Sequence, residues 1–405
     1  MKVSVIIPSY NSCERLYYNL ISLNHQNYPR NEFEVIVIDN GSIDNTSNML
    51  SEFNANYPLS IIRLKNNKGI AYARNKGILK SVGELLIFHD SDMIATKDFI
   101  KNHIEAHKDK NTVICGNCMR RIYSYYYKKF SRDQIKTLDN QKHRYNLNII
   151  PYHKNKSPLI TEEQIIDESF IDFSFDLNMP LMISMKLDVE KYGEELKGYN
   201  FPWKFFITNN CSVYKQNVIR VGLFDQKIIR YGFEDFDLGI RLYKLGCKFI
   251  IRHDILSIHQ EHPVNFTKDD IWHNLYYICE KYSNPYFVEM LLVCSNMYTS
   301  IDPNLINEIM NDINQIKEME QYKGLIDQLI EFLKILYKRH YEKYLQKSKK
   351  SFKNNKNERI KLHIDFCKIK KQGNELYELG LSHFVDTFYM LIKHVYGIDM
   401  MNVGI

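Results

Sequence analysis

The chain lacks long apolar runs. No stretch of its 405 residues approaches the roughly 18 apolar residues of a transmembrane helix. A secretory signal needs about 7–15 apolar residues, but the N-terminal run Val3–Ile7 contains the polar Ser4 and stops at Pro8. We therefore expect a cytoplasmic protein.

Cysteine is present, but without the arrangement of a disulfide framework or a zinc site. The eight cysteines are scattered along the sequence. Cys115 and Cys118 form a CxxC pair, yet a zinc site of this type needs a second pair, which is missing. We interpret this pair as free thiols at a strand end, with metal or redox use as the alternative.

The chain also lacks a strong excess of charge. Its formal net charge is +6, which helps anionic ligands approach but is not typical of a dedicated nucleic-acid binder. No zinc-finger or single-strand-binding motif is visible, so nucleic acid is not an expected partner. The content of 44% hydrophobic and 25% charged residues is that of an ordinary globular protein, and the length suggests two or three domains.

The first part of the sequence alternates between strand and helix patterns. The expected strands are Val3–Ile7, Phe33–Asp39, Ser60–Leu64, Glu84–Phe88 and Thr112–Cys115. The expected helices are one capped by Ser12, then Ile70–Lys80 and Asp98–His107. Strands that alternate with helices of this length predict an α/β fold, with a mostly parallel sheet and crossover helices.

The sequence pattern changes twice in the rest of the chain. Residues 119–200 show no clean period, and we expect a partly irregular insert there. Regular patterns resume with a helix near Asp235–Leu245 and a strand at Lys248–Ile258. Helical periodicity then dominates, so we expect a catalytic or binding domain over residues 1–265 and an α-helical domain over residues 266–405.

A basic run lies within the helical part. Glu342–Lys361 carries eight lysines and arginines against two glutamates. Such a run is usually a solvated helix face or loop, and the alternative is peripheral contact with an anionic membrane or an acidic protein.

Polar residues follow the expected strands, where ligands bind in open α/β sheets. The sequence FHDSDM places Asp90 and Asp92 at a strand tip, and both side chains point to the same side because side chains alternate along a strand. Two close carboxylates repel unless a cation neutralises them. The first strand is followed neither by GxGxxG nor by a Walker A sequence, which argues against dinucleotide and P-loop enzymes.

Four ordered motifs carry a family resemblance. VSVIIPSYN, VIVIDNGSIDNT, NNKGIAYARNKG and FHDSDM resemble the family 2 glycosyltransferases, which have the GT-A fold. The resemblance covers about residues 1–120 and continues at 205–262. It implies a Rossmann-like nucleotide-diphospho-sugar transferase sheet flanked by helices.

The resemblance also implies a donor site and a metal site. Residues expected to bind the nucleotide sugar are Pro8, Tyr10, Asn11, Asp39, Asn67, Arg74, Asp90 and Ser91. The DxD-type motif is expected to hold Mn²⁺ or Mg²⁺ on the donor diphosphate, with Asp92 as the direct ligand and Asp90 either sharing the metal or binding ribose.

The segment YGFEDFDLGIRLYKLGC resembles part of β-galactosyltransferases and of hyaluronan and chondroitin synthase modules. By this resemblance Asp235 is the base that takes the acceptor proton, and Glu234 contacts the acceptor. The alternative for both is helix capping and complementarity to the dipole at the N-terminus of the helix. We expect Asp237 and Arg241, at i,i+4 spacing, to form a structural pair.

Three further segments contribute candidates. His259 in SIHQEHP resembles a histidine that completes the metal site, and His262 is a second candidate. Asn209 and Asn210 in TNNCSVYK lie in a segment that resembles the donor-sugar contact of this fold. Trp203 either stacks on a sugar ring or is a buried core residue.

These features together predict an inverting, divalent-metal-dependent glycosyltransferase. It would move a single sugar from a UDP-sugar to a glycan, lipid or peptide acceptor, because the chain has one catalytic unit and a helical tail where the polymerising synthases have a second transferase module. The first alternative is a non-catalytic sugar-nucleotide-binding scaffold that kept the fold. The second is a nucleotidyltransferase, which would usually show a glycine-rich loop after the first strand, and PSYN is not one.

Overall fold

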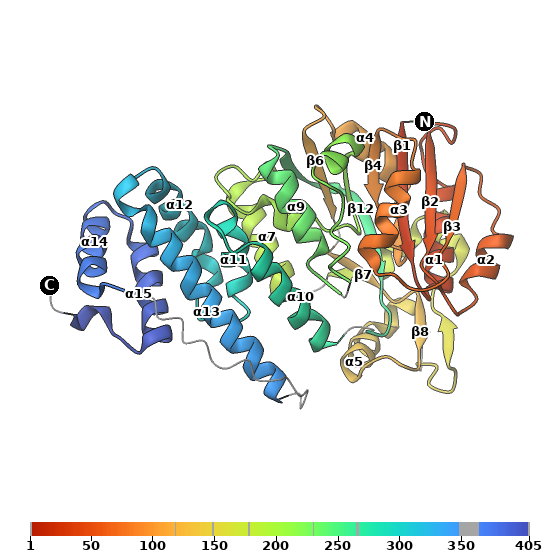
Figure 1. Cartoon of the computed structure of the whole chain (residues 1–405). Helices are drawn as coiled ribbons and strands as arrows, with labels where there is room; N and C mark the ends of the chain where they lie inside the picture. Colours follow the sequence, from red (N-terminus) through yellow and green to blue (C-terminus); the bar gives the residue numbers. More distant parts are fainter. Residues whose placement is uncertain are drawn as a thin grey trace. The chain divides into compact units, whose positions relative to one another are not determined.

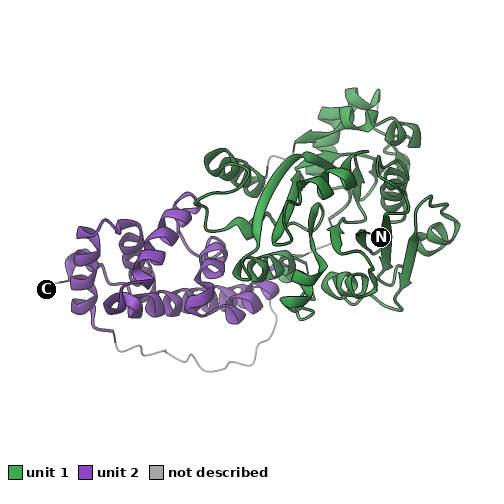
Figure 2. Cartoon of the chain, turned by 90° about the horizontal axis from the view of Figure 1, so that it is seen from above, with its two compact units in different colours: residues 1–270 green, residues 271–405 purple. Residues whose placement is uncertain are grey.

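The computed structural model describes residues 2–117, 119–147, 150–176, 179–229, 231–264, 267–347 and 364–403. The chain forms two compact units, Met1–Asp270 and Ile271–Ile405 (Figure 2). Among the described residues, no helix is long and apolar enough to cross a membrane.

A ten-stranded sheet forms the centre of the first unit, in the order β10-β7-β12-β6-β11-β4-β1-β2-β3, with β5 paired to β12 (Figure 1). Its strands are β1 (Val3–Ser9), β2 (Phe33–Asp39), β3 (Leu59–Arg63), β4 (Leu85–Phe88), β5 (Met93–Ala95), β6 (Thr112–Asn117), β7 (Arg120–Ile122), β10 (Phe175–Asp176), β11 (Cys211–Tyr214) and β12 (Lys248–Gln260). β1 runs parallel to both β2 and β4, whereas β11 runs antiparallel to β4 and β6. β1 and β2 are buried along their whole length, which is why they read as continuous apolar runs.

Helices flank this mostly parallel sheet, as expected from the sequence (Figure 1). They include α1 (Cys13–Asn24), α2 (Thr46–Glu52), α3 (Ile70–Lys80), α4 (Phe99–Ala106), α8 (Lys215–Arg220) and α9 (Glu234–Lys244). α3 packs very close to the strands, because a Cβ at Gly77 would lie 2.7 Å from Ile38 and 2.8 Å from Ile6. Ser12 occupies the N-cap position of α1 as expected, but its side chain makes no capping hydrogen bond.

The segment 119–200 is more regular than the sequence suggested. It contains β7, β8 (Tyr125–Tyr127), β9 (Lys156–Pro158), β10, α5 (Arg132–Gln141), α6 (Glu162–Ile166) and α7 (Pro180–Tyr192). Its aromatic residues give it a core of its own, including Tyr123, Tyr126 and Phe170. Capping boxes at Ser131 and Thr161 start α5 and α6, and this was the local signal available in the sequence.

The second unit is helical, as expected. Its helices include α11 (Val288–Ser295), α12 (Ile306–Lys317), α13 (Lys323–Lys347), α14 (Phe366–Glu378) and α15 (Ser382–Tyr396), and α10 (Lys268–Lys281) leads into it. Of the basic run, residues 342–347 end α13, and residues 348–361 lie outside the described part of the chain. The contact expected for that run stays a prediction. Cys115 is a buried thiol at the end of β6, and Cys118 also lies outside the described part.

Candidate active site

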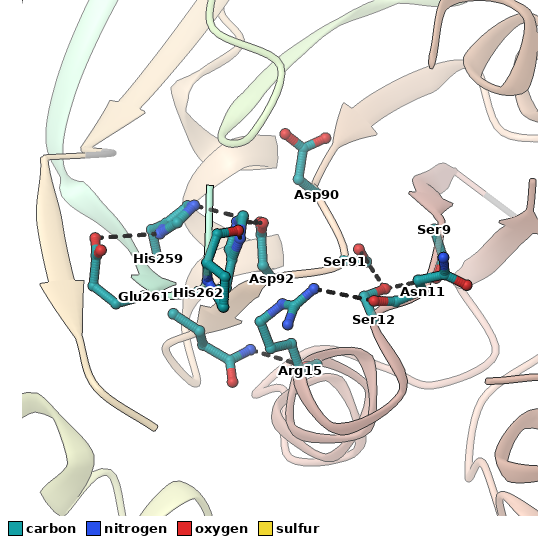
Figure 3. Close-up of polar contacts among 12 residues, drawn as sticks. Ser9, Asn11, Ser12, Arg15, Asp90, Ser91, Asp92, His259, Glu261 and His262 are labelled. Atoms are coloured by element: carbon teal, nitrogen blue, oxygen red, sulfur yellow. Dashed lines mark hydrogen bonds and ion pairs between the residues drawn. The ribbon is translucent and has the colours of Figure 1, made fainter. Parts of the chain in front are cut away.

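A cluster of one carboxylate and two imidazoles lies where β4 and β12 end. His259 Nε2 is 3.5 Å and His262 Nε2 is 3.0 Å from Asp92 Oδ2 (Figure 3). The short strand β5 pairs antiparallel with β12, so that Met93 lies opposite His259. The backbone N–H of Gln260 also donates to the Asp92 carbonyl at 2.7 Å. This pairing brings the two distant motifs together.

The three side chains fit a divalent cation. Their ligand atoms all lie within 4.8 Å of one another. His259 Nδ1 is buried and has no hydrogen-bond partner in the described part of the chain; Glu261 Oε1 lies 3.9 Å away. One carboxylate oxygen with two imidazole nitrogens is a suitable donor set for Mn²⁺.

Electrostatics favour the protonation states that a cation needs. Burial alone would raise the pKa of Asp92, but the neighbouring His259 and His262 hold it well below its usual value. Burial lowers the pKa of His259, with Asp92 opposing the shift. Asp92 is therefore ionised and His259 tends to be neutral, and these are the ligand forms.

Arg74 connects the DSD motif to the start of α9. This residue of α3 is only 1% exposed, and its guanidinium lies 2.9 Å from Asp90, 3.1 Å from Glu234 and 3.2 Å from Asp235. Two motifs far apart in sequence are therefore held by one buried cation. Arg74 was expected to bind the nucleotide sugar, and this expectation is corrected: its guanidinium organises carboxylates inside the protein.

The same network shifts the pKa values of two carboxyl groups. Burial, with the neighbouring Asp92 and Asp235, raises the pKa of Asp90 to about 6 against the opposing effect of Arg74. Burial and the neighbouring Asp235 raise the pKa of Glu234 to about 7, again against Arg74. Because Asp90 is paired with Arg74, it is a less suitable metal ligand than Asp92.

Asp235 projects from the first turn of α9 and is fixed by Thr208. Thr208 Oγ1 donates to Asp235 Oδ1 at 2.7 Å, and the Thr208 backbone N–H donates to Oδ2 at 3.2 Å. The residue before the helix, Phe233, has a φ of 74°, a left-handed conformation that is rare for bulky residues and clusters at functional sites. Phe233 occupies the N-cap position, so Glu234 and Asp235 do not cap α9. Both lie in the first turn of α9, where their charge complements the helix dipole, as the structural alternative expects.

The expected pair of Asp237 and Arg241 is confirmed. Arg241 Nη2 lies 2.5 Å from Asp237 Oδ2 at i,i+4 spacing. Arg241 also donates to the Val221 carbonyl, so the pair fixes α9 to the turn after α8.

Hydrogen bonds join the loop after β1 to the loop after β2. Asn11 Oδ1 accepts from the Ile43 N–H at 2.8 Å, and the Asn11 N–H donates to Ser42 Oγ. Asp39 Oδ1 accepts from the Ser42 N–H at 3.0 Å. Tyr10 is 45% exposed at this edge and offers a free aromatic face.

Other expected donor residues are placed differently. Pro8 is buried within β1 opposite Ile38, so its expected contact with the nucleotide is corrected to a structural role. Asn67 is exposed, and its Oδ1 accepts from Asn40 Nδ2 and from the Gly69 N–H, which shapes the loop after β3.

A chain of hydroxyls links α1 to the DSD motif. Ser12 Oγ–H donates to Ser91 Oγ at 2.9 Å, and Ser9 and Ser12 share a hydrogen bond of 2.8 Å (Figure 3). Ser91 is buried, so in the structure it connects strand ends and does not lie open to a ligand.

Asn209 and Asn210 are neighbours in the sequence but differ in their hydrogen bonding. Asn210 is buried; its amide donates to the Asn117 and Ile255 carbonyls, and its Oδ1 lies 3.1 Å from His103 Nε2. The expected sugar contact of Asn210 is therefore corrected to a structural one. Asn209 Oδ1 has no hydrogen-bond partner in the described residues, so Asn209 stays a candidate.

Trp203 is not a surface aromatic. It is 0% exposed and packs edge-on against Phe236 of α9, with ring centroids 5.5 Å apart. The buried alternative is therefore correct, and stacking on a sugar is excluded in this structure. Its backbone carbonyl would lie 2.8 Å from a Cβ at Gly239, which shows how closely α9 packs here.

Sequence reasoning missed two residues at this edge. Thr208 begins the TNN segment, but no role was expected for its hydroxyl. Arg121 of β7 lies directly beside His259 in the strand ladder, within a segment that showed no clean pattern.

Comparisons with known proteins agree with this fold. Residues 4–161 match the model of Glycosyl transferase family 2. An uncharacterized glycosyltransferase of Bacillus subtilis (strain 168), YfnE, is 40% identical over 410 residues, covering all of both chains. The chain therefore belongs to glycosyl transferase family 2. It is a glycosyltransferase with the GT-A fold.

More distant relatives match in part. The chondroitin synthase of Escherichia coli is 26% identical over 270 residues, which cover 66% of this chain and 36% of that enzyme. The crystal structure of Staphylococcus aureus TarS 1–349 in complex with UDP superposes with a TM-score of 0.49 at 16% identity, covering 86% of this chain and 92% of that one.

Proposed function

We propose that this protein is an inverting, divalent-metal-dependent glycosyltransferase that transfers one sugar from a UDP-sugar to a glycan, lipid or peptide acceptor. The observation that carries the proposal is the Arg74 network. One buried guanidinium contacts Asp90 beside the metal-site candidate and Asp235 at the start of α9. A donor site and a base for the acceptor are thus parts of one ion-pair network.

The donor nucleotide would lie over the loops after β1 and β2. The exposed face of Tyr10 is suited to stack on the base, and Asp39 and Asn11 lie beside it for the base and ribose. Asn209, with its unpartnered carbonyl oxygen, is the candidate for the sugar hydroxyls. Family membership supports a nucleotide-sugar donor of this kind.

Asp92, His259 and His262 would hold Mn²⁺ or Mg²⁺. When bound, the cation offsets the negative charge that develops on the leaving diphosphate. Asp90 would act through Arg74 and the donor ribose, because its carboxylate is already paired.

Asp235 would act as the general base. As the acceptor oxygen bonds to the anomeric carbon, the bond from that carbon to the diphosphate oxygen breaks, and the acceptor proton passes to Asp235. Attack from the face opposite the leaving group inverts the anomeric centre. Glu234 Oε2 has no partner in the described residues, so it can hydrogen-bond the acceptor.

The proposal is tested by calorimetric titration with a panel of UDP-sugars, with and without Mn²⁺, on the wild type and Asp92→Ala. Binding of one UDP-sugar that requires Mn²⁺ and is lost in Asp92→Ala is the expected result. The matched control is Asp327→Ala, which removes an exposed carboxylate of α13. If no UDP-sugar binds under any metal condition, the proposed UDP-sugar donor is wrong.

A further inference from the structure

Arg121 is a largely buried arginine whose donors are not used by the protein. Its side chain is 12% exposed. In the described residues its guanidinium makes no hydrogen bond: Nε is buried without a partner, and the nearest carboxylate oxygen, Glu261 Oε1, is 3.8 Å away. A guanidinium offers five N–H donors, and leaving a buried charged group unpaired is costly.

The other buried arginines of this unit are better satisfied. Arg74 contacts three carboxylates. Arg15 donates to the Tyr127 hydroxyl at 3.2 Å and to the Asn11 carbonyl at 3.3 Å. All three arginines have an Nε without a partner, but in the described residues Arg121, unlike the other two, also makes no hydrogen bond through its terminal nitrogens, which leaves these donors available to a ligand.

The position of Arg121 identifies the chemistry of that ligand. Arg121 pairs with His259 in the parallel ladder of β7 and β12, so the two side chains leave the sheet side by side. Arg121 Nε and His259 Nδ1 lie 3.8 Å and 3.9 Å from the same carboxylate oxygen, Glu261 Oε1. The guanidinium thus lies close to the metal-site candidate.

We propose that Arg121 binds the phosphate oxygens of the donor diphosphate and holds the nucleoside diphosphate after the sugar has left. This inference rests on the proposed function. A planar guanidinium matches phosphate oxygens in a bidentate manner. It would supply charge that the metal alone does not, because Asp92 already offsets part of the charge of a bound cation.

The test is calorimetric titration of UDP and of uridine into the wild type, Arg121→Met and Arg120→Met, in Mn²⁺ and again in EDTA. Arg120 is the matched control: it carries the same charge one position away, and its Nη2 donates to the Ser174 carbonyl. Arg121→Met should weaken UDP binding by about 10- to 100-fold in both buffers, the strength expected of a charge-assisted bidentate pair. Uridine affinity should not change, and Arg120→Met should bind UDP as the wild type does.

The inference is overturned if Arg121→Met binds UDP like the wild type, or if Arg120→Met weakens UDP binding equally. It is also overturned if Arg121→Met lowers the affinity for uridine as much as the affinity for UDP. Each of these leaves the proposed function standing if the wild type binds UDP. If the wild type binds UDP in neither buffer, the proposed UDP donor fails as well. Misfolding is checked independently by urea unfolding of each variant, because Arg121→Met also removes the ion-pair partner of Glu261. Arg121→Lys should bind UDP with intermediate affinity.

Discussion

Thr208 donates a hydrogen bond to each carboxylate oxygen of Asp235, through its hydroxyl at 2.7 Å and its backbone N–H at 3.2 Å. Arg74 adds a contact to Oδ1 at 3.2 Å. Among the described residues, Oδ1 therefore has two donors and Oδ2 has the backbone N–H alone. Under the proposed function, Oδ2 is the atom with a lone pair available to an acceptor hydroxyl.

Replacing Thr208 by valine should slow the reaction without weakening donor binding. The isosteric change removes the hydroxyl and leaves Asp235 held only by the Thr208 backbone N–H and Arg74 among the described residues, and small misplacements of a catalytic group cost about 100-fold in rate. We expect kcat to fall about 10- to 100-fold with the donor KM unchanged, measured by steady-state kinetics. Thr208→Ser should restore most of kcat. An unchanged kcat in Thr208→Val, or no recovery with serine, would show that the hydroxyl does not position Asp235.

Replacing Arg74 by methionine should destabilise the fold. The change leaves Asp90, Glu234 and Asp235 without their shared cation, and breaking a buried ion pair costs about 3–5 kcal/mol. The free energy of unfolding in urea measures this loss. Lys76→Met is the control, since Lys76 is exposed on the same helix and should change stability little. A loss as small as that of the control would mean that the carboxylates do not depend on Arg74.

Glu234 should make stability fall as the pH rises. Its pKa is raised from 4.5 to about 7 in the folded protein. The folded state therefore holds this proton more tightly, so the stabilisation is complete below pH 4.5 and is lost as the pH rises through about 7. The free energy of unfolding of Glu234→Gln, minus that of the wild type, should increase between pH 5 and pH 8 by at most about 3 kcal/mol. Glu342→Gln, at an exposed site of α13, should show no such trend. A flat difference for Glu234→Gln would contradict the raised pKa.

Mn²⁺ should stabilise the protein through His262 as well as Asp92 and His259. A ligand that binds only the folded state adds about 2.7 kcal/mol at 100 times its Kd, so the wild-type Tm should rise by several degrees in excess Mn²⁺. His262→Ala should reduce Mn²⁺ affinity by about tenfold or more, because a ligand atom is lost. His253→Ala removes an exposed histidine from the same strand and should leave the affinity unchanged. Equal Mn²⁺ affinity in His262→Ala and the wild type would remove His262 from the metal site.

Asn209 and Asn210 should respond differently to alanine. Asn210→Ala leaves the Asn117 and Ile255 carbonyls without donors and should cost about 1–3 kcal/mol of stability in urea unfolding. Asn209→Ala should preserve stability and lower kcat/KM for the donor, because Asn209 Oδ1 has no protein partner in the described residues. If Asn209→Ala lowers stability and Asn210→Ala lowers kcat/KM, then Asn209 is the structural residue and Asn210 is the donor-binding residue.

Much of the sheet could be predicted because its signals are local. β2 and α3 lie at the expected residues, since a buried parallel strand is continuously apolar and an amphipathic helix has a clear period. The segment 119–200 could not be assigned, because its strands are two or three residues long and its core consists of aromatic residues from many short elements. Trp203 was left open for a related reason: only the packing of α9 decides whether an aromatic residue is covered.

The sequence by itself determined the family, the alternation of strands and helices, and the motifs at the strand ends. These depend on short-range order, which one chain displays directly. The tertiary structure alone decided which polar groups are already satisfied. It showed Arg74 inside a carboxylate network, Asn210 within a set of backbone contacts, and Arg121 without a hydrogen bond. The physical reason is that hydrogen bonding and burial depend on groups far apart in the chain, so a residue's type does not reveal whether its donors remain available to a ligand.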